Sequence, residues 1–534
     1  MTTIAPPMPR AGPAEWILAT DHKRTAIRIA VAAFVFFIAS GVLALLMRTE
    51  LAQPGLQIVS TDTYNQLFTM HGSGMIYLVV TPLALAVGLY FVPLQIGAAD
   101  VVAPRLTAFG FWLYLGGGLT MFSGFLTSTG AGKAGWTAFY PLAGEQASPG
   151  QGMDMWIIGV ILAVAGMMLV AATILLTLIR QRAPGMDITR LSPFSWSMFF
   201  TCAMTVTSFP ALIVAMGLLL ADRQLGGVFD TPGGPATYQN LFWFYGHPVV
   251  YVMFFPFLGV VADVVATFSR RRLFGYPFLV LSLFAFTGLS MSVWAHHMFA
   301  TGQVNNEYFS LTSTALAVPA GVEYFDLIAT MIGGAVLLRT PMLFALGFLA
   351  LFLIGGLTGI LVGSPPIDYH VHDTYFVVAH FHYTLFGGSL MGAFAAVYYW
   401  FPKVSGVMLR EWIGKLQFAL LFIGVNLTFF PMFLLGYDGM PRRVADYSPT
   451  AGFTGDNRIA TIGAYVIALG IAAFVANLIV SLRAREPAGD DPWEGQTLEW
   501  ATSSPPPRLN FSAVPPIRSY APLVDLREER EGKR

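Results

Sequence analysis

The sequence predicts an all-α integral membrane protein with twelve transmembrane helices. Of its 534 residues, 55% are hydrophobic and only 11% are charged, whereas soluble domains carry about a quarter charged residues. The mean hydropathy is +0.65. Apolar segments of about 20 residues, the length that crosses a bilayer core as a helix, recur along the chain. These observations exclude a soluble globular enzyme of ordinary composition.

The predicted spans follow one another from the N-terminal region to near residue 482. They lie near residues 26–47, 67–97, 107–128, 154–180, 194–221, 240–268, 276–299, 309–333, 341–363, 374–400, 413–436 and 460–482. The first 25 residues are polar and rich in Pro, without the apolar core of a secretory signal. We therefore expect a cytoplasmic N-terminal tail at 1–25, one helical domain at 26–484 and a Pro-rich cytoplasmic C-terminal tail at 485–534.

The distribution of charge predicts the orientation. If the N-terminus is cytoplasmic, most Lys and Arg residues fall in loops on the same side, while the opposite loops carry mainly Lys133, Arg223, Arg442 and Arg443. The positive-inside rule then places both termini in the cytoplasm and the chain in the cell (inner) membrane. Lys plus Arg and Asp plus Glu number 29 each, so no basic surplus exists for nucleic acid. The single cysteine, Cys202, excludes disulfide scaffolds, iron–sulfur clusters and Cys-rich zinc sites.

Eight of the nine histidines lie in or beside the apolar segments, where an ionisable side chain is costly without a partner. Imidazole is the obvious metal ligand in a chain with so little Cys. His380 and His382 lie two residues apart on one predicted helix, so they point about 200° apart and reach different neighbours. His71 lies deep in the second predicted span, beside two glycines.

Two further motifs bring histidines to ligand spacing. His296 and His297 are adjacent on the seventh predicted helix, about 100° apart. His247 stands one helical turn before Tyr251. A lone histidine of this kind could be a packing residue, but three imidazoles from two helices can hold a metal ion and leave one coordination position open. A twelve-helix transporter would explain the hydropathy but not these sets of histidines.

With these residues the chain resembles subunit I of the heme–copper oxidoreductases, most closely the A-type cytochrome c or quinol oxidase large subunit. The resemblance covers essentially the whole chain and implies the heme–copper oxidase subunit I fold. The matching motifs are Pro93-Leu-Gln-Ile-Gly-Ala-Ala-Asp100, Gly135-Trp-Thr137, His247-Pro-Val-Val-Tyr251, Trp294-Ala-His-His297, the run 372–382, Gly439-Met-Pro-Arg-Arg443, Asp491-Pro-Trp493 and the run 497–507.

The resemblance implies two hemes, expected to be of the a type. His71 and His382 are similar to the axial ligands of a low-spin heme, and His380 to the proximal ligand of a high-spin heme, with Phe381 between the rings. His247, His296 and His297 resemble the ligands of a copper ion opposite the second heme. Tyr251 is similar to the tyrosine that is covalently joined to the first copper ligand.

The resemblance also implies residues around the hemes. His372 and Asp373 resemble the contribution of subunit I to a magnesium site. Arg442 and Arg443 resemble the pair that neutralises heme propionates, and Trp136 and Asp368 are expected near the same propionates. Such an enzyme reduces dioxygen to water, takes electrons through a subunit II from cytochrome c or quinol, and works with further subunits in the lipid bilayer. Proton translocation is open, because the proton pathways depart from the family pattern.

The residues that handle protons differ from the usual A-type pattern. Val249 stands where the family commonly has a glutamate, and Tyr245-Gly246 matches only half of the Tyr-Ser pair that replaces it in a subgroup. Asp100 matches the aspartate at the start of one pathway, but the asparagines that line that pathway are replaced at Leu89, Thr107 and Ala108. Asp100 could equally be an ordinary loop carboxylate.

The eighth predicted helix shows the largest departure. The family's Pro-Thr-Gly-Val-Lys is replaced by Pro319-Ala-Gly-Val-Glu323, and Asp326 follows on the same helix face. A buried carboxyl can also carry protons, so we expect Glu323 to replace the lysine. Nitric oxide reductases, which share this plan and place glutamates near a non-heme iron, are the alternative. Tyr251 favours the oxidase, because dioxygen chemistry is what requires it.

Overall fold

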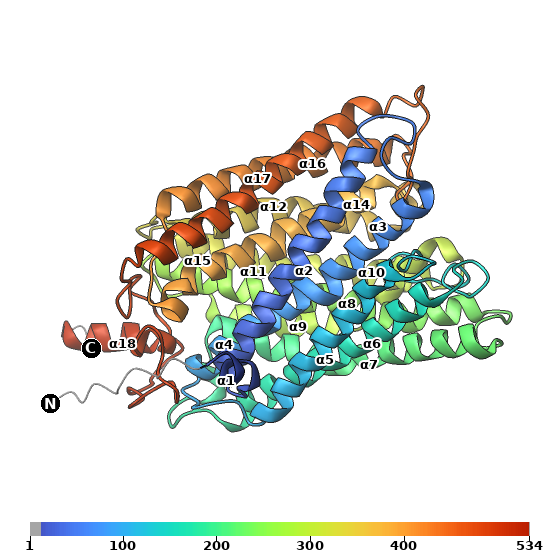
Figure 1. The fold of residues 1–534 in the computed structure, drawn as a ribbon. Helices are drawn as coiled ribbons and strands as arrows, with labels where there is room; N and C mark the ends of the chain where they lie inside the picture. Colours follow the sequence, from blue (N-terminus) through green and yellow to red (C-terminus); the bar gives the residue numbers. More distant parts are fainter. Residues whose placement is uncertain (1–11, 533–534) are drawn as a thin grey trace.

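The computed structural model describes residues 12–532. Figure 1 shows long helices running side by side between two ends of the molecule. One end carries α1 (Pro13–Leu18) and α18 (Pro522–Arg530), and we call it the terminal face. The opposite end, where α3 begins and α16 ends, is called the far face. This arrangement satisfies backbone hydrogen bonds within each helix, as a lipid environment requires.

Ten helical runs of the described chain are long and apolar enough to cross a membrane. They are α2 (His22–Glu50), α3–η1–α4 (Thr61–Gln95), α5–η2 (Pro104–Leu126), α6 (Gln151–Arg180), α7 (Pro193–Leu225), α8 (Gly234–Phe268), α9–η4 (Tyr276–Thr301), α12 (Thr340–Val362), α16 (Glu411–Tyr437) and α17 (Thr454–Ala484). Each overlaps one of the predicted spans. An all-helical membrane protein is therefore confirmed.

The two remaining predicted spans are helical but interrupted. The segment near 309–333 consists of α10 (Asn306–Ala315) and α11 (Ala317–Met331), which meet at Leu316. The segment near 374–400 consists of α14 (Tyr375–His382), the π-helix η5 (Tyr383–Leu390) and α15 (Met391–Ser405). Neither segment satisfies both the length and the mean hydropathy required of a candidate membrane span. The number of twelve transmembrane helices therefore stays a prediction.

Helix α8 is the centre of the molecule (Figure 1). It is apolar and buried along most of its length, as expected for a helix enclosed by others. Both π-helices directly follow a histidine region: η1 (Gly74–Val80) begins three residues after His71, and η5 begins directly after His382. π-helical turns are rare and frequent at functional sites.

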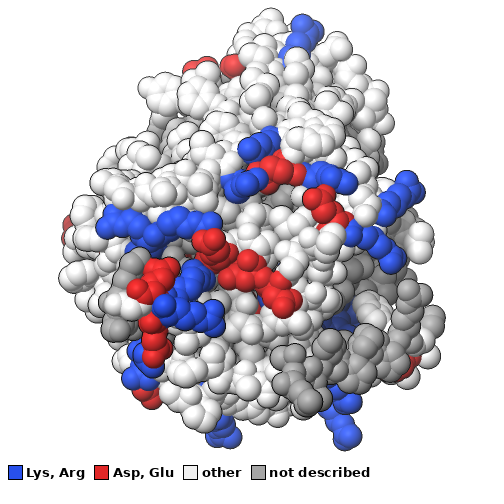
Figure 2. Space-filling view, turned by 90° about the vertical axis from the view of Figure 1, so that its left-hand side faces the viewer, with Lys and Arg blue, Asp and Glu red and all other residues white. Residues whose placement is uncertain are grey.

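The segment from Arg485 to α18, predicted as a tail, lies across the terminal face and is packed there. Trp493 and Trp500 are buried, and the Lys403 ammonium donates to the carbonyls of Asp490 (2.8 Å) and Thr502 (2.6 Å). Figure 2 shows acidic and basic side chains interspersed on this face. Three short helices complete the chain: η3 (Ile188–Arg190), α13 (Pro365–Val371) and η6 (Leu498–Ala501).

Candidate active site

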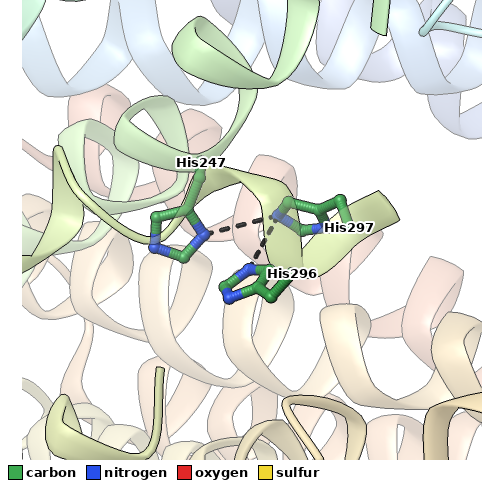
Figure 3. A group of neighbouring side chains, drawn as sticks. All are labelled: His247, His296 and His297. Atoms are coloured by element: carbon green, nitrogen blue, oxygen red, sulfur yellow. Dashed lines mark hydrogen bonds between the residues drawn. The ribbon is translucent and has the colours of Figure 1, made fainter. Parts of the chain in front are cut away.

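Three imidazoles from α8 and η4 face one another at the centre of the site (Figure 3). His247 Nδ1 lies 3.4 Å from His297 Nε2, and His296 Nε2 lies 3.0 Å from the same atom. Three nitrogens that each lie about 2.0 Å from one metal ion are about 3.3 Å apart in a tetrahedral site. The observed spacing therefore fits a three-histidine metal site with one open position.

The histidines at 296 and 297 do not lie on an α-helix, as the sequence analysis expected. α9 ends at Ser290, and both histidines belong to the 3₁₀-helix η4 (Trp294–Thr301). Successive residues of a 3₁₀-helix are about 120° apart rather than 100°. Both rings nevertheless face His247, with ring centroids 4.4 and 5.5 Å away.

Neighbouring side chains hold these rings in place. His296 Nδ1 lies 2.7 Å from Ser313 Oγ, whose own hydroxyl donates to the carbonyl of Phe309. Ser313 must then accept from Nδ1–H, which leaves Nε2 of His296 free for a metal ion. The indole of Trp243 stacks on His297 at 3.9 Å. Ser313 was missed in the sequence, because nothing in its local pattern marks it.

Tyr251 lies one turn after His247 on α8, and their ring centroids are 4.8 Å apart. Tyr251 also packs against Phe286 of α9 at 4.7 Å. Tyr245, on the other side of His247 in sequence, is buried and packs against Phe209 at 5.0 Å. Of the two tyrosines, Tyr251 has its ring against the metal-ligand imidazole.

A second group of histidines is built from α3 and α14. The rings of His71 and His382 are nearly parallel, at 11°, with centroids 6.4 Å apart. His71 Nδ1 lies 2.9 Å from the carbonyl of Ser40, and His382 Nδ1 lies 2.8 Å from that of Val378. Because a carbonyl only accepts, each Nδ1 carries the hydrogen and each Nε2 keeps its lone pair. Two such rings fit the axial positions of one heme.

His380 belongs to the same helix but reaches a different neighbour. Its Nδ1 lies 3.0 Å from the carbonyl of Gly355 on α12, so its Nε2 is also free to bind a metal. His382 instead stacks on Phe429 of α16 at 4.2 Å, and on Phe381 at 4.6 Å. His380 lies close enough to His296 and His297 to interact with them electrostatically.

His372 and Asp373, predicted near magnesium, meet Asp368, predicted near the heme propionates, at the end of α13 on the far face. Asp368 lies 3.2 Å from His372 Nδ1, and this hydrogen bond raises the pKa of His372. Asp373 lies 3.9 Å from the other nitrogen of His372 and accepts from Arg442 Nε at 2.6 Å. The carboxylate of Asp373 is thus already paired with a cation.

Arg443 and Trp136 come together at the same end. The guanidinium of Arg443 lies 5.9 Å above the ring of Phe68, and burial lowers its pKa to about 10. Gly135 lies directly against this guanidinium. The indole of Trp136 packs edge-on against Trp243 at 5.8 Å. Trp243 therefore connects this group to the three-histidine site.

Several buried polar atoms of the described chain have no hydrogen-bond partner, among them His247 Nε2, Trp243 Nε1 and the Nε and Nη1 atoms of Arg48. Leaving such a donor unsatisfied costs about 1–3 kcal/mol. Unpaired donors in and near the site fit bound groups that carry polar atoms, such as heme. Arg48 was not predicted, because it lies directly after the predicted span 26–47, in the last turn of α2.

Glu323 is buried on α11 and accepts from Ser282 Oγ on α9 at 3.3 Å. Ser282 lies one turn before Phe286, the residue that contacts Tyr251. Asp326 lies one turn nearer the terminal face, where its buried carboxyl fits against Gly275, which has no side chain to obstruct it. Glu323 is therefore not a solvated residue at a helix end.

Asp100 lies far from this group, in the loop between α4 and α5 at the terminal face. Its Oδ1 accepts from the backbone N–H groups of Val101 (2.8 Å) and His22 (3.2 Å), and burial raises its pKa. Leu89 is a buried apolar side chain, and the hydroxyl of Thr107 donates to the carbonyl of its own helix at Ala103. The structure does not bring Asp100 together with the six histidines of the candidate site.

Comparisons with known proteins match nearly the whole chain. A family model described as Cytochrome C and Quinol oxidase polypeptide I matches residues 24–466. A probable cytochrome c oxidase subunit 1-beta of Nocardia farcinica is 48% identical over 96% of this chain and 87% of its own length. A cytochrome c oxidase subunit 1 of Corynebacterium efficiens is 47% identical over 97% and 90%.

A solved heme-copper terminal oxidase dimer has the same fold, with a TM-score of 0.74 at 19% identity over 86% of this chain and 84% of that one. The relatives named above are oxidases, so the comparisons do not favour the nitric oxide reductase that the sequence left as an alternative. Because the family model and the relatives each span most of the chain, the chain belongs to the family of cytochrome c and quinol oxidase polypeptide I, the heme–copper oxidase subunit I.

Proposed function

We propose that this chain reduces dioxygen to water as the catalytic subunit of a respiratory terminal oxidase with two a-type hemes and one copper ion. The observation that carries this proposal is the arrangement of six histidines: the parallel pair His71 and His382, and His380 close to the group formed by His247, His296 and His297. Oxidase relatives at nearly half identity support the same activity.

The bound hemes and copper supply the one-electron chemistry and the open coordination position that dioxygen reduction requires. The chain itself holds these groups through imidazole nitrogens. In His71, His296, His380 and His382 the other ring nitrogen is already hydrogen-bonded. Tyr251, against His247, is placed to give a proton at the reacting centre. The apolar surroundings of α8 exclude water, so an uncompensated charge there is expensive and each electron must be matched by a proton.

Protons reach Tyr251 from the terminal face through Asp326 and Glu323, with Ser282 as the hydrogen-bond partner of Glu323. This order follows the positions of the residues along α9 and α11. Asp326 lies beside Gly275, at the start of α9, whereas Glu323 bonds to Ser282, one turn before Phe286. Asp100 and Tyr245 belong to a second route that lacks its polar lining at Leu89 and Ala108. The Glu323 route therefore serves the reaction.

The remaining assignments concern the surroundings of the subunit. A subunit II delivers electrons from cytochrome c at the far face, where Arg442, Arg443, Trp136 and Asp368 surround the heme propionates and His372 with Asp373 contributes to a magnesium site. The chain crosses the cell inner membrane twelve times, with the terminal face in the cytoplasm. The names of the relatives support cytochrome c as the donor.

The proposed activity is tested by measuring dioxygen and nitric oxide consumption side by side on the purified complex, with reduced cytochrome c or a quinol in excess. Fast dioxygen uptake with little nitric oxide turnover is expected. Rapid conversion of nitric oxide to nitrous oxide with feeble dioxygen uptake would overturn the proposal. Optical spectra of the extracted hemes test the a type independently.

A further inference from the structure

A buried polar cluster at the terminal face takes no part in the site described above. Gln95, the last residue of α4, donates from Nε2 to Asp263 Oδ2 on α8 and to Glu499 Oε1 on η6, each at 3.2 Å. The hydroxyls of Ser192 and Ser195 both donate to Gln95 Oε1, at 2.8 Å from Ser195. In this orientation both serines donate to the amide oxygen, and the NH₂ group faces the two carboxyl groups.

The two carboxyl groups are buried without a counter-ion. Asp263 is 4% exposed and Glu499 is fully buried, and no ion pair of the described chain includes either. Asp263 Oδ2 and Glu499 Oε1 both accept from Gln95 Nε2 at 3.2 Å, so the distance between these two oxygens cannot exceed twice that value. The Lys403 ammonium, which interacts electrostatically with Glu499, donates its hydrogen bonds to backbone carbonyls. Two ionised carboxylates in this position would repel each other in a medium that screens poorly.

The hydrogen bonds of Glu499 are unequal at its two oxygens. Oε1 accepts from Gln95, from Trp400 Nε1 at 3.0 Å and from Thr497 Oγ1 at 2.8 Å. Oε2 is buried and has no partner. A cavity of about 10 Å³, lined in part by Asp263 and Thr497, adjoins the cluster, and about one water molecule fits such a space. The unpartnered Oε2 is the atom of Glu499 on which a proton would be held.

Burial raises the pKa of Glu499. The titratable side chains that interact with the pair are Lys403 and Tyr399 on α15, Tyr276 on α9 and Tyr520 in the C-terminal segment. Asp490 and Asp491 act on Lys403. The tyrosines are neutral, whereas the Lys403 cation favours the ionised form of Glu499 and opposes the effect of burial.

We propose that Asp263 and Glu499 share one exchangeable proton, and that this proton fastens the C-terminal segment, residues 485–530, to the terminal face. When the proton is lost, two negative charges face one amide and the segment loosens. Because the docked state binds the proton more tightly than the undocked one, docking is complete at low pH and is lost as pH rises.

The same segment covers the loop that carries Asp100. Asn510 donates to the carbonyl of Ala98 at 2.7 Å and accepts from Lys23 Nζ at 2.6 Å. Loosening of the segment would therefore expose this loop to the surrounding solution. The C-terminal segment thus covers the terminal face while the proton is bound, and it detaches from this face as pH rises.

Hydrogen–deuterium exchange of the purified holoenzyme tests this inference. Labelling at about pH 6 and about pH 9, with times scaled for the intrinsic exchange rate, reports the protection of residues 493–502. In the unaltered chain we expect protection to fall about tenfold or more between these conditions. Each of the single variants Asp263→Asn and Glu499→Gln removes one of the two carboxyl groups. In each variant the protection of residues 493–502 should therefore be independent of pH.

Glu494→Gln is the matched control, because this exposed carboxyl lies in the same segment and pairs only with Arg270 at 3.2 Å. It should keep the pH profile of the unaltered chain, and the heme absorbance of each variant reports whether it has folded. If the protection of residues 493–502 in the unaltered chain does not change with pH, the inference is overturned even if both variants fail to fold. An unchanged pH profile in Asp263→Asn would overturn it equally.

Discussion

The histidines of the site differ in what holds their second nitrogen. His71, His380 and His382 donate to backbone carbonyls, which no substitution removes directly. His296 instead depends on the side chain of Ser313. A partner of this kind fixes the tautomer and the orientation of a metal ligand. Ser313 is therefore the position at which the hydrogen bonding of the metal site can be tested by substitution.

We expect Ser313→Ala to weaken copper binding by about 10- to 100-fold, because His296 loses the acceptor that keeps its Nδ1 protonated. The copper-to-heme ratio after dialysis against a graded chelator measures this effect. Thr314→Ala is the control, since its exposed hydroxyl bonds only to the carbonyl of Ser310. Equal copper retention in the two variants would show that Ser313 does not orient the ligand.

Glu323→Gln should lower dioxygen turnover about 100-fold, because an amide keeps the hydrogen bond with Ser282 but cannot carry a proton. Stopped-flow or electrode measurements of dioxygen uptake with excess donor give the rate. Glu323→Asp, which keeps an ionisable group, should retain much more activity than the amide. Turnover of Glu323→Gln near that of the unaltered enzyme would rule out Glu323 as a proton carrier.

At the scale of elements, close contact between helices positions the ligands. α12 approaches η5 at Gly355, where an added Cβ would lie 2.8 Å from the backbone nitrogen of Thr384 and 2.9 Å from the carbonyl carbon of Tyr383. Backbone atoms cannot move aside as a flexible side chain can. The same glycine supplies the carbonyl that holds His380, so helix packing and the orientation of the proposed heme ligand depend on one position.

Gly355→Ala is expected to destabilise the protein by about 1–3 kcal/mol and to reduce the content of high-spin heme, because α12 and its carbonyl must move away from His380. Thermal unfolding and the optical spectrum of the reduced enzyme report the two effects. Gly356→Ala is the matched control, since the nearest atom to its Cβ lies at an ordinary 3.8 Å. If both alanine variants behave alike, the close contact has no role in heme binding.

At the scale of the whole molecule, the apolar surface matches a bilayer. α12 exposes Leu353, Leu357 and Leu361 at a spacing of four residues, which forms one outward stripe of a helix. The polar and charged side chains gather at the ends instead, as Figure 2 shows for the terminal face. Such a surface is stable only with lipid around the helices.

The interrupted segments α10–α11 and α14–α15 should both cross the membrane, and introduced cysteines test this. Gln303→Cys and His370→Cys, at the far face, should react with an impermeant maleimide in intact cells. Leu337→Cys and Arg410→Cys should react only after the membrane is opened. The unaltered chain is the control, because its Cys202 is buried. Labelling of Gln303→Cys and Leu337→Cys from one side would contradict a span between them.

Much of the fold was predictable because local rules govern a chain in lipid. Every backbone polar group there must bond within its own segment, so long apolar runs become helices. The interruptions at Leu316 and at η5 were not predictable, because hydropathy shows neither a kink nor a π-turn. The winding of η4 was also missed, since the pattern around His296 is equally compatible with an α-helix.

The sequence by itself determined which side chains are available as ligands, because His380 and His382, or His247 and Tyr251, are related by the turn of one helix. Only the tertiary structure decided which partners complete them. Ser313 contacts His296 and Gly355 contacts His380 from separate helices, and Gln95 links Asp263 to Glu499. Such contacts follow from how side chains fill the space between helices, and no periodicity in the sequence records that packing.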